Sequence, residues 1–229
     1  MSSENKPNRL LSFLTDMLRS FFEVMKSRYL YIALISFFFG AALNFASQTY
    51  LHNYMLEGKT LPMLSDLILD NIPTVNVALW YDIFALVPIV IVVIYIIHKK
   101  DYKRIPFIIL MSAIFYIVRG IFIVLTPFGN PPDFTGSYPL FNGFSKYDIG
   151  VYPSGHAGNV FLLFLLVNDK IYKWIIMTCL IFVILTLFLA HGHYSIDILS
   201  GLFFSYAIVS FGEKHLKMFD LSYKQESSG

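Results

Sequence analysis

Residues 105–125 read IPFIILMSAIFYIVRGIFIVL and hold a single charged side chain, Arg119. A helix needs about 20 mostly apolar residues to cross a hydrocarbon core of about 30 Å, and this stretch meets that requirement. The rest of the chain shares its composition: 56% of the 229 residues are hydrophobic and 14% are charged, with a mean hydropathy of +0.63. Because soluble domains carry about 25% charged residues, we expect a membrane protein.

Other apolar segments extend this prediction to the whole chain. Four are long enough to span a membrane: 29–48, 76–98, 171–190 and 196–213. A shorter one, Gly155–Val167, reaches spanning length only with its flanks. The sequence therefore predicts an all-α, polytopic membrane protein with six transmembrane helices. The catalytic membrane domain covers 29–215, and 216–229 form a cytoplasmic tail.

The N-terminal segment, residues 1–28, has a different pattern. Apolar residues such as Leu10, Leu14 and Met17 recur on one helical face, and charged residues fall largely opposite. This pattern is typical of an amphipathic helix lying in the membrane interface on the cytoplasmic side. A packed cytoplasmic cap and a dimer contact are the alternatives.

Basic residues predict the orientation of the spans. Cytoplasmic loops of membrane proteins collect Lys and Arg. With the N-terminus inside, every Lys and Arg falls on the cytoplasmic side except Lys59, Lys146 and Arg119. Both termini are therefore expected to be cytoplasmic.

Ionisable residues within or at the edge of a span are candidates for function, because placing them there is costly. Four stand out: Arg119, His156, His193 and Asp197. The predicted topology brings all four to the outer, periplasmic or lumenal leaflet, although other residues determined that topology. We expect one active site there.

The spacing of these residues indicates their chemistry. His193 and Asp197 lie four residues apart and share a helical face, so the carboxylate can hold the imidazole Nδ1–H and leave Nε2 as a nucleophile. Ser154 is a suitable helix N-cap, and the unpaired N–H groups from Gly155 onward form a phosphate site. His156, in that first turn, is the expected general acid and base.

Other polar residues carry weaker predictions. His191 either binds a metal with His193 and Asp197 or only lies beside them. Since no further carboxylate or cysteine completes a familiar zinc set, we expect no metal and no cofactor. Tyr194 and Asp82 are possible supporting residues.

Aromatic residues are frequent in the loop of residues 126–153. Together with Trp80 or Tyr81 they are suited to hold a quaternary ammonium by cation–π contact, although an interfacial aromatic belt explains them equally well.

Several of these motifs, in this order, resemble the phosphatidic acid phosphatase type 2 superfamily, and within it the sphingomyelin synthase-like branch. Pro153-Ser154-Gly155-His156 matches the superfamily's P-S-G-H motif. His191-Gly-His-Tyr-Ser-Ile-Asp197 is similar to the synthases' H-x-H-Y-[ST]-x-D, and Leu61-Pro62…Asp66…Asp70…Pro73 to their first motif. The resemblance runs from about residue 60 to about residue 210 and implies a phosphatidic acid phosphatase type 2-like core.

The departures from the superfamily pattern concern its cations. Arg119 stands where the superfamily has lysine, Thr126-Pro127 where it has Arg-Pro, and Leu187 where it has a second arginine. Arg119 and Thr126 match the synthases' R-x6-T pattern and are candidates to bind the substrate phosphate. One fixed cation in a poorly hydrated site favours a phosphodiester over a doubly charged monoester.

The resemblance implies a membrane enzyme that transfers a phospho-head group from a phospholipid donor to a lipid alcohol, such as ceramide or diacylglycerol, through a phosphohistidine. A lipid phosphatase or phospholipase C-like hydrolase with the same histidines is the alternative. A transporter or lipid-binding scaffold is a third reading, but transporters gather their polar residues at mid-membrane. No nucleic-acid partner is expected, and the oligomeric state is open.

Overall fold

The computed structural model describes residues 9–135, 147 and 149–223, which form helices and no strands. The longer helices are α1 Arg9–Met25, α2 Arg28–Leu56, α3 Ala78–Lys99, α4 Ile105–Leu125, α5 Gly155–Leu166, α6 Lys170–Leu189 and α7 Ser195–His215. The described residues also include the short 3-10 helices η1 Leu69–Asn71, η2 Tyr102–Arg104 and η4 Lys217–Phe219. The prediction of an all-α protein is confirmed.

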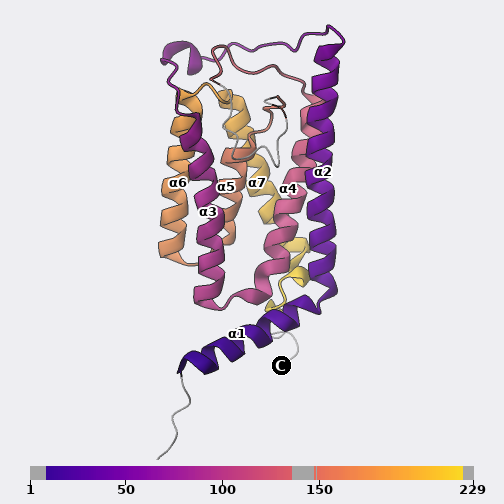
Figure 1. Cartoon of the computed structure of the whole chain (residues 1–229), viewed down its shortest axis with the longest axis vertical. Coiled ribbons are helices and arrows are strands. Elements are labelled where there is room, and N and C mark those ends of the chain that lie inside the picture. Colours follow the sequence, from indigo (N-terminus) through magenta and orange to yellow (C-terminus); the bar gives the residue numbers. More distant parts are fainter. Residues whose placement is uncertain (1–8, 136–146, 148, 224–229) are drawn as a thin grey trace, which may run out of the picture.

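Helices α2 to α7 run side by side in one bundle, and α1 lies across one end of it (Figure 1). Helix α2 packs on α4, α3 on α6, and α5 on α7, while α5 also contacts α3, α4 and α6. The opposite end of the bundle, called the histidine end below, holds residues 150–156 and 190–197. The connections from α2 to α3 and from α4 to α5 at this end are long, that from α6 to α7 is a short turn, and the turns at the α1 end are short (Figure 1).

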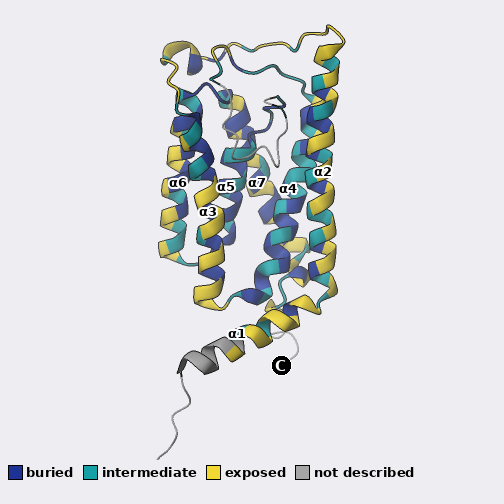
Figure 2. Ribbon diagram, viewed as in Figure 1, coloured by how far each residue is buried: buried dark blue, intermediate teal, exposed yellow. Residues whose placement is uncertain are grey.

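The outward faces of the bundle are exposed (Figure 2), and many of the exposed side chains are large and apolar. Ile35, Phe38 and Trp174 are each about seventy per cent exposed. Five helices, α2, α3, α4, α6 and α7, are long and apolar enough to cross a membrane. Apolar side chains on the outside of a helical bundle are what contact with lipid requires, and the polytopic prediction is supported for these five helices.

Helix α5 is shorter than the prediction of six full spans required. Its flanks do not extend it, because Ser154 and Val167 cap its two ends in non-helical conformations. At 1.5 Å per residue its 12 residues cover about 18 Å, less than a hydrocarbon core of about 30 Å. The described residues therefore contain five candidate spans and one shorter apolar helix.

Helix α1 has the amphipathic character that its sequence predicts. Leu18, Phe21 and Phe22 are largely exposed, whereas Val24 is buried in the core of the bundle. Glu23 forms an ion pair with Lys103 at 3.7 Å, which ties the end of α1 to η2. The location of α1 in the membrane interface stays a prediction.

Glycines allow α5 and α7 to approach closely. A Cβ on Gly201 would lie 2.7 Å from the carbonyl oxygen of Ser154, and one on Gly158 would lie 3.1 Å from the carbonyl oxygen of Gly201. The Ser205 hydroxyl donates to the Gly158 carbonyl at 2.7 Å across this interface. The start of α5, with its P-S-G-H motif, is therefore fixed against α7.

We predict that Gly201→Ala destabilises the fold. The added methyl group meets a backbone oxygen, which moves only with its helix, and overpacking of this kind costs about 1–3 kcal/mol. Thermal unfolding in detergent should show a lower Tm for Gly201→Ala, with the exposed Ser210→Ala on the same helix unchanged. A wild-type Tm for Gly201→Ala would contradict this packing.

Candidate active site

His156 and His193 face each other at the histidine end, with ring centroids 6.0 Å apart. His156 lies in the first turn of α5, and His193 in the turn between α6 and α7. Both side chains line a cavity of about 130 Å³, together with Arg119, Gly155 and Leu187 among others. Two residues that are distant in sequence thus share one small space.

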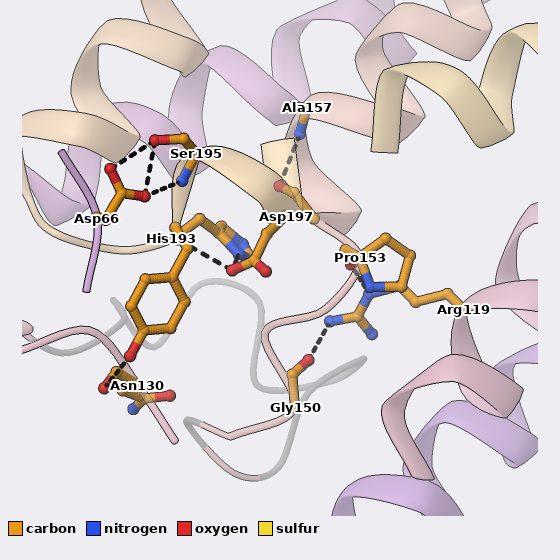
Figure 3. A network of polar contacts seen from close by, with 11 residues as sticks. Asp66, Arg119, Asn130, Gly150, Pro153, Ala157, His193, Ser195 and Asp197 are labelled. Atoms are coloured by element: carbon orange, nitrogen blue, oxygen red, sulfur yellow. Dashed lines mark hydrogen bonds and ion pairs between the residues drawn. The ribbon is translucent and has the colours of Figure 1, made fainter. Parts of the chain in front are cut away.

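Asp197 orients His193. Its Oδ2 lies 3.4 Å from His193 Nδ1 and accepts a 2.9 Å hydrogen bond from the Tyr194 backbone N–H (Figure 3). Asp197 is fully buried. Burial lowers the pKa of His193, although the Asp197 carboxylate opposes that shift. The imidazole is therefore neutral at physiological pH, the form that acts as a nucleophile.

Asp82 on α3 plays the corresponding part for His156. Its Oδ1 lies 3.1 Å from His156 Nε2, and the side chain is fully buried. The edge of the Tyr81 ring packs on the imidazole, with centroids 5.1 Å apart. Each histidine is thus paired with its own buried carboxylate. The sequence singled out Asp82 only as a possible supporting residue, without a partner.

Arg119 on α4 holds the loop that leads into α5. Its Nε donates to the Pro153 carbonyl at 3.1 Å, and one terminal nitrogen donates to the Gly150 carbonyl at 3.0 Å (Figure 3). The other donates to Asn44 Oδ1 on α2 at 2.7 Å. These bonds use three of the five guanidinium N–H groups. The positive charge remains beside the cavity, next to the N–H groups that start α5.

Gly155 gives Arg119 the space it occupies. A Cβ at this position would lie 3.0 Å from Arg119 Nε, so the absence of a side chain lets the guanidinium lie against the helix start. The N-cap Ser154 is fully buried, and its hydroxyl accepts from the Ala157 N–H at 3.4 Å. Of the two candidates at this helix start, Gly155 therefore lines the cavity and Ser154 has a capping role.

Asp66 forms a polar cluster that the sequence did not predict. Its carboxylate accepts hydrogen bonds from the Ser195 hydroxyl at 2.6 and 2.7 Å and from the Ser195 backbone N–H (Figure 3). The backbone N–H groups of Ile68 and Leu69 donate to it as well. Burial by itself would raise the pKa of Asp66, but the bonds from Ser195, Ile68 and Leu69 outweigh it and lower the pKa. The cluster fixes the loop before α3 to the first residue of α7.

Tyr194 joins the same cluster and lies away from the cavity. Its hydroxyl donates to the Asn130 carbonyl at 3.2 Å and accepts from the Leu64 N–H at 3.1 Å. The side chain is buried, and Tyr194 is the N-cap residue of α7. Tyr194 therefore shapes the turn after His193.

Two other predicted residues form hydrogen bonds with residues that do not line the cavity. Thr126 donates to the Phe122 carbonyl of its own helix at 2.6 Å and is not among the described residues that line the cavity. His191 has a positive φ of 49°, and its Nδ1 lies 3.0 Å from the Pro132 carbonyl. Within residues 9–135, 147 and 149–223, no group of three His, Cys, Asp or Glu side chains is placed to hold a metal.

The aromatic residues of the predicted cage are only partly visible. Tyr81, Phe134 and Tyr147 line the cavity. Trp80 is half exposed and stacks on Phe84 instead. Other aromatics of the loop, Tyr138, Phe141 and Phe144, lie outside the described residues.

We predict that Asp66→Asn lowers stability in a pH-dependent way. The amide places N–H donors against the N–H groups of Ser195 and Ile68, at a cost of about 1–3 kcal/mol. Because the folded pKa of Asp66 is lowered, the carboxylate's contribution is complete above the ordinary aspartate pKa of about 3.9 and is lost as the pH falls through the folded pKa.

Thermal unfolding from pH 7 to pH 3 measures this. The difference in Tm between wild type and Asp66→Asn should be largest near pH 7 and shrink below about pH 4. Asp70→Asn, an exposed change on the same loop, serves as control. A Tm difference that stays constant with pH would show that the charge of Asp66 is not what stabilises this contact.

Comparison with known families agrees with this geometry. The family model described as PAP2 superfamily C-terminal matches residues 152–214, from the loop before α5 to the end of α7. That range contains His156, His193 and Asp197. A search of the curated proteins found no match. The match shows that this part of the chain is similar to the PAP2 superfamily, whose chemistry is of the phosphatase or phosphotransferase type.

Proposed function

We propose that the chain is a membrane phosphotransferase of the sphingomyelin synthase-like kind. It moves a phospho-head group from a phospholipid to a lipid alcohol through a phosphohistidine. The observation that carries this proposal is the pair of histidines at one cavity, each with a buried carboxylate partner, next to a single arginine. A nucleophile and a separate acid are the two groups that phosphoryl transfer through a covalent intermediate requires.

The first step forms the covalent intermediate. The donor phosphate lies against Arg119 and the N–H groups at Gly155 and His156, where the helix start favours an anion. His193 Nε2 attacks phosphorus, and the bond from phosphorus to the glycerol oxygen breaks. His156 gives its proton to that oxygen, and diacylglycerol leaves. Asp197 stabilises the positive charge that develops on His193.

The second step returns the enzyme to its starting state. His156, now neutral, takes the proton of the acceptor hydroxyl, such as that of ceramide. The acceptor oxygen attacks phosphorus, and the bond from phosphorus to His193 Nε2 breaks. Asp82 stabilises the protonated imidazole of His156 that results.

The charge of the cavity supports a phosphodiester as donor. Arg119 is the sole Lys or Arg among the described residues that line it. Leu187 is buried and lines the same cavity, at the position where the resembled superfamily has a second arginine. A diester carries one negative charge and needs one cation, whereas a monoester carries nearly two.

Basic residues support an active site in the outer, periplasmic or lumenal leaflet. Lys99, Lys103, Arg104 and Lys214 all lie at the α1 end of the bundle, opposite the histidines. Since cytoplasmic loops collect such residues, we assign the α1 end and both termini to the cytoplasm.

We predict that the purified protein in detergent transfers a head group to fluorescent ceramide or diacylglycerol from at least one donor in a phospholipid panel. Mass spectrometry identifies the products. His193→Ala should reduce turnover by roughly 10³-fold or more, because the nucleophile is lost. His98→Ala, a change at the α1 end where His98 bonds Tyr172, should leave turnover unchanged.

The products separate the alternatives. Free phospho-head group or phosphate without an acceptor product means a hydrolase in which water replaces the lipid alcohol. Equal turnover by wild type and His193→Ala would rule out the phosphohistidine.

We further predict that Leu187→Arg changes the preferred ester. A second cation in the cavity should raise turnover of phosphatidic acid, a monoester, relative to a phosphodiester donor by about tenfold, which corresponds to about 1.4 kcal/mol. Leu187→Met is the control for size. The ratio is measured within each variant, so partial loss of folded protein does not affect it. An unchanged ratio in folded Leu187→Arg would show that cavity charge does not select the ester.

A further inference from the structure

A second, larger cavity of about 640 Å³ lies between α3 and α4. The two helices pack on different partners, α3 on α6 and α5, and α4 on α2, which leaves this space between them. Its walls are almost entirely apolar and include Ile89, Val93 and Ile97 on α3 and Ile105 and Ile109 on α4. Small-molecule sites in proteins measure about 300–1,000 Å³, so the size suits a ligand.

The apolar cavity adjoins the histidine cavity. Tyr116 on α4 and Asn159 on α5 line both of them. Asn159 lies one helical turn beyond His156, which places the junction directly next to the reacting groups. A molecule with its phosphate at the histidines can therefore extend into the apolar cavity without crossing a helix.

The apolar cavity extends along α4 toward the α1 end of the bundle. Along α4 its walls run from Tyr116 to Ile105, which is about 16 Å at 1.5 Å per residue. At the far end the α1 side chains Met17, Leu18 and Phe21 line it. The cavity thus begins beside the polar histidine cavity and has an apolar length that runs toward the α1 end.

We propose that this cavity, called the acyl groove below, holds one hydrocarbon chain of the lipid whose phosphate is at the histidines. This inference rests on the proposed function and specifies its substrate class: a long-chain lipid ester, not a soluble phosphoester. Because bilayer tails are as apolar as the groove walls, moving a chain into the groove gains little by itself. The groove acts by positioning, since it fixes where the phosphate lies relative to His193.

A matched pair of substitutions on α3 tests the acyl groove. Val93 lines it, whereas Val90 does not, and the two are about equally exposed at 51% and 53%. Val93→Trp places a large side chain in the groove. This position lies about 12 Å along α3 from Ala85, which lines the histidine cavity. A donor with four-carbon chains ends before that point, and a donor with sixteen-carbon chains reaches it.

Val93→Trp should lower the ratio of kcat/KM for the long-chain donor to that for the short-chain donor by about tenfold or more, because a displaced phosphate reacts slowly. Ile109→Trp on the opposite wall should do the same. Val90→Trp should keep the wild-type ratio. Wild-type ratios in both Val93→Trp and Ile109→Trp would overturn the proposal.

A binding measurement separates this inference from the proposed function. A phospholipid with a photoreactive diazirine midway along one chain is cross-linked to the protein in detergent, and the adducts are mapped by mass spectrometry. Adducts on groove residues that decrease in Val93→Trp, but not in Val90→Trp, support the acyl groove. They do so even if the wild-type protein turns over no donor. In that case only the proposed function fails. Adducts confined to outward positions such as Val90 and Ile94 would overturn the acyl groove whatever the activity.

Discussion

The partly buried charge of Arg119 is the constraint on which the histidine end depends. A charged group within an apolar bundle must find polar partners, because its desolvation is costly. Arg119 finds them in the Gly150 and Pro153 carbonyls and in Asn44. Asn44 is in reach because the backbone of α2 comes close to Gly120, whose carbonyl accepts from Ser47 at 2.7 Å. One guanidinium thereby fixes α2, α4 and the loop into α5, and with that loop the position of His156.

Asp197 is the second fixed point, and it connects the two histidines. Its side chain contacts His193 and Tyr194, while its backbone carbonyl accepts a 3.0 Å hydrogen bond from the Ser154 N–H. The turn that carries His193 and the helix start that carries His156 therefore share one residue. Close packing of α7 on α5 at Gly201 keeps this relation rigid. Geometry of this kind is what a two-step transfer needs, because the same two groups act on one phosphorus atom in turn.

Local patterns in the sequence predicted much of this arrangement. Five apolar segments correspond to five candidate spans, and the spacing of His193 and Asp197 anticipated their contact. Local patterns could not predict contacts between distant segments. Examples are the contact of His156 with Asp82, 74 residues away, and that of Ser195 with Asp66, 129 residues away. These depend on how each helix is rotated in the bundle, which periodicity alone does not determine. Thr126 shows the converse: a motif match suggested the phosphate, but its hydroxyl bonds its own helix.

The surroundings of the histidines bear on which acceptor the proposed enzyme uses. His193, Asp197 and Asp82 are buried, and the cavity that His193 lines is small. Burial that lowers the pKa of His193 also limits the access of water to a phosphohistidine at this position. The apolar groove that joins this cavity favours the binding of a lipid alcohol over the entry of water. In the proposed enzyme, the burial that makes the nucleophile neutral favours transfer to a lipid alcohol over hydrolysis, and a lipid chain bound in the proposed acyl groove fills space that water would otherwise occupy.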